Sequence, residues 1–103
     1  MDEIYTVLLD HDLHRSRKLD VLYDYVEDHL MAGHWETLDT FLSEAPVEQL
    51  EPSVAVGLLA TTFIEKQQFS CWEDTVARVR AHLLTHEGFD EARVNACLAG
   101  FER

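Results

Sequence analysis

Apolar residues recur every three or four positions through most of the chain, and this spacing predicts amphipathic helices. The clearest run occupies residues 15–32. Its apolar side carries Leu19, Leu22, Tyr23, Val26 and Leu30. Gly33 follows and predicts the end of this helix, because glycine accepts the left-handed conformation found there. A second run over residues 35–45 ends before Pro46, and the short link predicts that the two helices form an antiparallel hairpin.

Three further helices are predicted downstream. Residues 53–67 are the most apolar stretch and predict a central helix, in which Gly57 favours close approach of a neighbouring helix. Residues 72–88 predict a fourth helix that Gly88 stops. A closing helix starts at Asp90 and is expected to bury Val94, Cys97, Leu98 and Phe101.

The first 14 residues give the weakest pattern. Residues 2–10 fit either a short helix capped by Asp2 or a strand, and residues 11–18 are polar. We therefore expect residues 1–14 to be a loosely packed N-terminal segment. The whole chain, residues 1–103, is predicted to be a single all-α domain. It would be either a small helical bundle or two stacked antiparallel helical hairpins plus a closing helix.

One hairpin resembles a known repeat family. The run Gly33-x-Trp35-x-x-Leu38-x-x-x-Leu42-x-x-Ala45 is similar to the second helix of a tetratricopeptide repeat. Leu22, Tyr25 and Val26 resemble the preceding first helix. About 34 residues after them the apolar pattern recurs as Val56, Leu59, Ala60 and Phe63. Leu38 is larger than the alanine usual in the family, and Gln67 stands where a glycine is expected.

The resemblance implies stacked helix pairs whose groove binds an extended peptide. Carried onto this chain, it places Asp24, Asp28, Thr62 and Lys66 in that groove. Members of the family that grip a carboxylate tail use basic groove residues, whereas this chain has acids on its first clear helix.

The charge of the chain limits the kinds of partner that it is expected to bind. It has 20 acidic and 8 basic residues, for a formal net charge of −12. Such a charge repels phosphate, so we expect no direct binding to nucleic acid or to an anionic membrane. It favours encounter with basic proteins. An acidic cluster on the 15–32 helix is either a solvated face or a docking stripe, with Tyr25 as its aromatic anchor; its members are Asp20, Asp24, Glu27 and Asp28.

The leading hypothesis is therefore a non-enzymatic protein-interaction module that presents an acidic helical surface to a basic partner. One alternative is an acidic mimic of nucleic acid that inhibits a nucleic-acid-binding protein. Another is a structural subunit that self-assembles into a homo-oligomer. Two unpaired cysteines, an acidic N-terminus and the lack of an apolar run of about 20 residues favour the cytoplasm.

Candidate catalytic or metal-binding residues are few. His82 and His86 share a side of the fourth predicted helix and could ligate zinc, but the sequence offers no identifiable third ligand. Two surface histidines are the simpler interpretation. His11-Asp12 matches the dipeptide of metal-dependent phosphohydrolases, yet no helix precedes it to supply further ligands. Acidic neighbours would raise the pKa of the Cys71 thiol, whereas its position at the start of a predicted helix would lower it. We therefore predict no enzyme activity, no cofactor and no bound metal.

Overall fold

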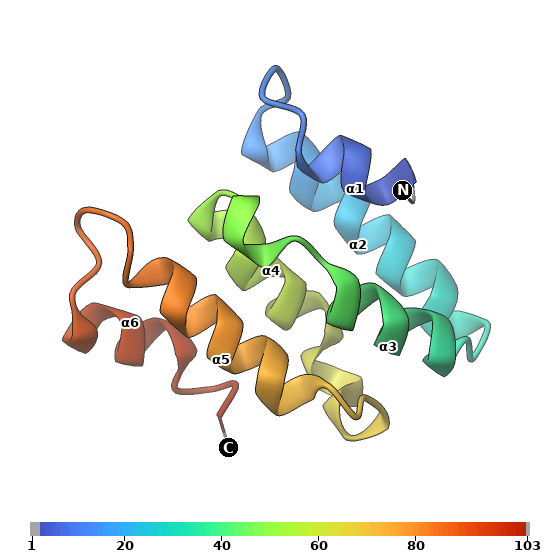
Figure 1. Cartoon of the computed structure of the whole chain (residues 1–103). Helices are drawn as coiled ribbons and strands as arrows, with labels where there is room; N and C mark the ends of the chain where they lie inside the picture. Colours follow the sequence, from blue (N-terminus) through green and yellow to red (C-terminus); the bar gives the residue numbers. More distant parts are fainter. Residues whose placement is uncertain (1–2, 103) are drawn as a thin grey trace.

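The computed structural model describes residues 3–102, and every regular element in that range is helical (Figure 1). The α-helices are α1 (Glu3–Leu8), α2 (Arg15–Met31), α3 (Trp35–Glu44), α4 (Pro52–Thr62), α5 (Trp72–Leu83) and α6 (Glu91–Leu98). Two 3₁₀-helices, η1 (Val47–Gln49) and η2 (Phe63–Gln68), flank α4. The prediction of an all-α fold is confirmed. Asp2, the expected cap of the first helix, lies outside the described residues.

α4 packs mainly against α2 rather than against α3, which precedes it in the chain. α2 and α3 form one helical hairpin, α4 and α5 form the next, and α4 lies between α2 and α5. α1 rests on α2, α6 rests on α5, and these two short helices occupy opposite ends of the molecule (Figure 1). The principal extents of 38 × 34 × 20 Å describe a flat arrangement.

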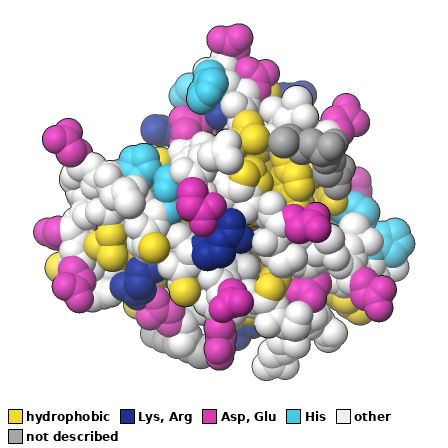
Figure 2. Space-filling view, viewed as in Figure 1, with side chains coloured by type: hydrophobic (Ala, Val, Ile, Leu, Met, Phe, Trp, Pro, Cys, Tyr) yellow, Lys and Arg dark blue, Asp and Glu magenta, His cyan; other side chains and the backbone are white. Residues whose placement is uncertain are grey.

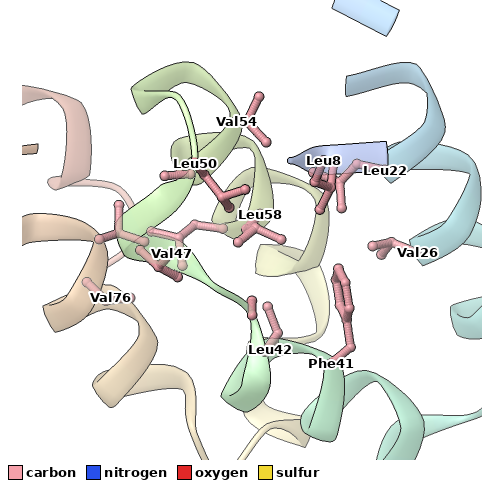
Figure 3. Close-up of a cluster of buried hydrophobic side chains, with 14 of the residues drawn as sticks. Leu8, Leu22, Val26, Phe41, Leu42, Val47, Leu50, Val54, Leu58 and Val76 are labelled. Carbon is pink, nitrogen blue, oxygen red and sulfur yellow. The ribbon is translucent and has the colours of Figure 1, made fainter. Parts of the chain in front are cut away.

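The hydrophobic core is centred on α4. Residues of α4 that are buried point both to α2 and to α5; they include Val54, Ala55, Leu58 and Leu59. Figure 3 shows Val54 and Leu58 near Leu8, Leu22 and Leu42 in one continuous apolar cluster. A helix that is apolar on most sides must be covered on most sides, and the predicted central position follows from that requirement.

Two glycines have structural roles that the sequence indicated. Gly33 has a φ of +71° and ends α2, as predicted. A Cβ atom on Gly57 would lie 2.5 Å from Cδ2 of Leu19 and 3.6 Å from Cδ2 of Leu22. The absence of a side chain at Gly57 therefore lets α4 approach α2 closely.

Residues 3–8 are not loosely packed, which corrects the expectation for this part of the N-terminal segment. Ile4, Tyr5 and Leu8 are buried. The Tyr5 hydroxyl donates a hydrogen bond to the Phe41 carbonyl at 2.7 Å, and the two rings stack with centroids 5.4 Å apart. The apolar side of α1 covers the α2–α3 hairpin, a partner that lies too far along the chain for local periodicity to identify.

The C-terminal end of α3 is held by side chains from other helices. The last carbonyls of a helix lack partners within it. Tyr5 donates to the Phe41 carbonyl, and Arg78 of α5 donates to the carbonyls of Ser43 and Ala45 at 3.2 and 2.7 Å. Arg78 also forms two hydrogen bonds of 3.0 Å with the carboxylate of Glu48. One arginine therefore joins α5 to the corner between α3 and η1.

Three expectations for the C-terminal half are wrong in detail. α5 ends at Leu83 with Leu84 as its C-cap residue, and Gly88 lies in the following loop with a φ of +85°. Cys97 is exposed, since Val94 and Leu98 occupy the buried stripe of α6. The central helix changes to the 3₁₀-helix η2 at Phe63 rather than continuing to Gln67.

Candidate interaction surface

The outer side of α2 carries the predicted acidic cluster. All four members are exposed: Asp20, Asp24, Glu27 and Asp28. Leu22 and Val26 are buried and fix the opposite side of the helix against the core. Figure 2 shows that acidic side chains also spread over the face of the molecule turned toward the viewer, where lysine and arginine are few. α2 therefore presents a continuous carboxylate surface within an acidic protein.

The charges of α2 are arranged against its own dipole. The N-terminus of a helix favours acids and its C-terminus favours bases. The first turn of α2 instead carries Arg15 and Arg17, and three of the four acids lie in its C-terminal half. Asp24 is four residues from both Asp20 and Asp28, and like charges at that spacing destabilise a helix by about 0.2–0.5 kcal/mol per pair. Helix stability does not explain this charge order.

The ion pairs of the described residues lie elsewhere. They join Lys18 to Glu51, Arg78 to Glu48 and Arg80 to Glu102. None of the three uses a carboxylate of the α2 cluster. Within residues 3–102 the cluster is thus left without an ion-pair partner.

Tyr25 does not lie where the sequence analysis expected an exposed anchor. It is half-buried, and its ring packs 4.9 Å from the Phe41 ring and 4.5 Å from the His29 ring. Tyr23 and Met31 are the large apolar side chains that α2 exposes, with 57% and 84% of their surface accessible. A turn of 100° per residue places both beside Glu27. The angular positions of residues around the helix would have identified Tyr23 and Met31. Choosing an aromatic residue because acids adjoin it in the sequence led to Tyr25 instead.

The groove implied by the repeat resemblance is not assembled as expected. Thr62 is buried, and its hydroxyl donates to the Leu58 carbonyl at 2.7 Å within α4. It therefore cannot contact a peptide from that position. Lys66 lies in η2, with its ammonium 4.9 Å from the centre of the Phe63 ring. Asp24 and Asp28 remain on the outer side of α2.

His82 and His86 adjoin each other but differ in setting. His82 is only 7% exposed, and its Nε2 lies 2.6 Å from the Leu50 carbonyl. His86 follows the end of α5, so the two do not share a helix, although their Nε2 atoms are 3.4 Å apart. They line a pocket of about 740 Å³ together with Glu48 and Arg78. The interpretation of two surface histidines is wrong for His82.

A metal centre is not formed at this pocket by the residues that the structure describes. In residues 3–102 no group of three or more His, Cys, Asp or Glu side chains is placed to hold a metal ion. His82 instead joins α5 to the segment after η1 through its bond with Leu50. Its role in the described fold is structural.

The surroundings of Cys71 disfavour its thiolate form. The pKa of Cys71 is raised to about 11. Burial is the largest cause, and a hydrogen bond with Asp39 is the second. Burial alone would also raise the pKa of Asp39, but hydrogen bonds from Cys71 and Ser70 outweigh it and hold that pKa below its usual value. The shift has the sign expected from a neighbouring acid rather than from a helix start. The acid responsible is Asp39 of α3, far away in the sequence, rather than its neighbours.

Two further residues have roles that their sequence context did not reveal. His14 caps α2, because its Nδ1 accepts a hydrogen bond from the Ser16 backbone N–H at 3.1 Å. Lys18 is 3% exposed, and its ammonium lies 3.1 Å from the carboxylate of Glu51 at the start of α4. The polar stretch before residue 19 therefore forms the first turn of α2 and ties it to α4.

No family model matches the chain, and neither the curated proteins nor the solved structures include a match. Among residues 3–102 no helix has the length and apolarity needed to cross a bilayer.

Proposed function

We propose that this chain is a non-enzymatic docking module that uses the outer side of α2 to bind a basic protein surface. The observation that carries the proposal is the unpaired acidic cluster of α2, set beside the exposed side chains of Tyr23 and Met31. The carboxylates would attract lysine and arginine side chains of the partner. The two apolar side chains would supply the apolar contact area that charged side chains do not provide.

The charge order of α2 supports the same function. Acids near a helix C-terminus and like charges four residues apart both oppose folding by tenths of a kcal/mol. A basic partner would neutralise these carboxylates and remove the repulsion between them. The free energy that the fold loses in isolation would then contribute to binding.

The test is a comparison of two variants that lose equal charge. The first carries Asp24→Asn, Glu27→Gln and Asp28→Asn on α2. The matched control carries Asp12→Asn, Glu44→Gln and Glu87→Gln, all at exposed positions away from that surface. Partners retained from a lysate at low salt would be identified by mass spectrometry and their affinities measured with purified components.

We expect the α2 variant to bind the partner about 5- to 30-fold more weakly, since removing the three charges costs on the order of 1–2 kcal/mol in total. The control should retain it. We also expect the α2 variant to be at least as stable as the natural chain, because its removed charges repel one another. Equal loss in both variants would show that only net charge matters and would contradict the assignment to α2.

The same experiment separates the two alternative functions. If the chain mimics nucleic acid, the retained partner will be displaced by DNA or RNA and will leave at moderate salt, because many phosphate-like contacts release counterions together. If it self-assembles, its mass in solution will be a multiple of the chain mass without any partner. The docking module proposed here predicts a monomer whose partner is not displaced by nucleic acid.

A further inference from the structure

The turn between α2 and α3 brings two histidines together. The backbone N–H of Gly33 donates to the Leu30 carbonyl at 3.1 Å, and the N–H of His34 donates to the His29 carbonyl at 2.9 Å. With the positive φ of Gly33, these bonds form a Schellman motif. That motif places the side chains of its first and last residues in contact, and here those residues are His29 and His34.

The two imidazole rings face each other through the same nitrogen. Nδ1 of His29 lies 3.0 Å from Nδ1 of His34, and the ring centres are 5.2 Å apart. In the neutral pair one Nδ1 donates and the other accepts. His34 is exposed and His29 is half-buried, so solvent reaches the pair.

The separation of the two nitrogens matches the distance between two neighbouring ligand atoms on one metal ion. With metal–nitrogen bonds of about 2.0–2.1 Å, two ligands at a right angle lie about 2.9 Å apart, and two at the tetrahedral angle lie about 3.4 Å apart. The observed 3.0 Å fits the right-angled pair. Square-planar or tetragonal geometry with nitrogen ligands is typical of Ni²⁺ and Cu²⁺.

The surroundings hold the pair in this arrangement. The Tyr25 ring packs at 4.5 Å against the His29 ring and at 4.9 Å against the Phe41 ring of the core. His34 stands at the start of α3, and its backbone is fixed by the bond to His29. A metal ion would therefore meet ligands that need little reorganisation, which favours binding.

We propose that His29 and His34 form a two-nitrogen chelating site for Ni²⁺ or Cu²⁺, with the remaining coordination positions open to water. Metal binding replaces the hydrogen bond between the two Nδ1 atoms. The ring that donated from Nδ1 loses that proton to solvent and takes one up on Nε2, so that both neutral rings ligate through Nδ1. The pair formed by His82 and His86 is the poorer site. His82 is buried, and its Nε2 is engaged with the Leu50 carbonyl.

The test is calorimetric titration of the full chain with NiCl₂, which also avoids the reactivity of Cu²⁺ with an N-terminal amine. The variants are His29→Ala and His34→Ala, with His11→Ala and His86→Ala as controls that remove a histidine elsewhere. Circular dichroism would establish that each variant is folded. Ni²⁺ should also quench the fluorescence of Trp35, which directly follows His34.

We expect one Ni²⁺ per chain, with affinity reduced at least about tenfold in both site variants, because even loss of a residue that only supports a ligand costs 10–100-fold. The two controls should bind as the natural chain does. The proposal is overturned if Ni²⁺ does not bind, if the site variants bind equally well, or if His86→Ala alone abolishes binding.

Discussion

The close approach of α4 to α2 gives the sharpest prediction for stability. Gly57 faces Leu19, and an added methyl group would lie 2.5 Å from Cδ2 of that leucine. Such a contact is impossible without movement, so Gly57→Ala must shift Leu19 or separate the helices. In a variant with Leu19→Ala the obstructing atom is absent, and the same methyl group should fit.

The effect of Gly57→Ala on the free energy of unfolding is the sum of two opposing contributions. Alanine is favoured over glycine inside a helix by about 1 kcal/mol. Overpacking of a core contact costs about 1–3 kcal/mol. The obstructing atom is the terminal methyl group of a half-buried leucine, which can move aside, so the cost falls at the low end of that range. Gly57→Ala should therefore leave the free energy of unfolding of the natural chain within about 0.5 kcal/mol of its value. With Leu19→Ala present, Gly57→Ala should raise that free energy by about 1 kcal/mol, giving a coupling of about 1 kcal/mol between the two positions.

The assay is urea unfolding of the natural chain, both single variants and the double variant, followed by circular dichroism and tryptophan fluorescence. Equal slopes with denaturant would show that all four unfold alike. Additive effects within about 0.5 kcal/mol would refute the close packing of the two helices at this point. A gain of the full helix-propensity difference of about 1 kcal/mol from Gly57→Ala in the natural chain would refute it as well.

Three further predictions concern hydrogen bonds and ionisation. Tyr5→Phe should lower the free energy of unfolding by about 1 kcal/mol in thermal or urea unfolding, because the Phe41 carbonyl loses its donor. Alkylation by iodoacetamide at pH 8 should modify exposed Cys97 long before Cys71, whose pKa is raised to about 11; equal rates would contradict the burial of that thiol. The hydrogen bond from Arg78 lowers the pKa of Glu48. The ionised carboxylate therefore contributes stability above pH 4.5, and this contribution is lost as the pH falls through the depressed pKa. Glu48→Gln should therefore flatten the loss of stability below pH 4.5.

Most of the fold could be predicted because local signals set it. Leu19, Leu22 and Val26 mark the inner side of α2, and Gly33 marks its end. The position of α1 could not be predicted, since its contact is with Phe41 and no periodicity connects residues so far apart. The burial of Lys18 was missed for the same reason, because Glu51 supplies its counter-charge from another helix.

The candidate surface could be predicted in charge but not in detail. Acids four residues apart must share a side of a helix, so Asp20, Asp24 and Asp28 were identified correctly as exposed neighbours. Tyr25 was chosen for its type, whereas its angular position directs it toward Phe41. The contact of His29 with His34 depends on the backbone bonds around Gly33, which the sequence suggests only as a helix end.

The end of α3 depends on donors from both sides of the sequence. Tyr5 reaches it from α1, and Arg78 reaches it from α5. A fragment that contained only the α2–α3 hairpin would leave these carbonyls to water and would lose the last turn of α3. The chain is therefore expected to unfold in one cooperative transition. Deletion or duplication of a single hairpin should disrupt the whole fold. An array of independent repeats, by contrast, would tolerate such a change.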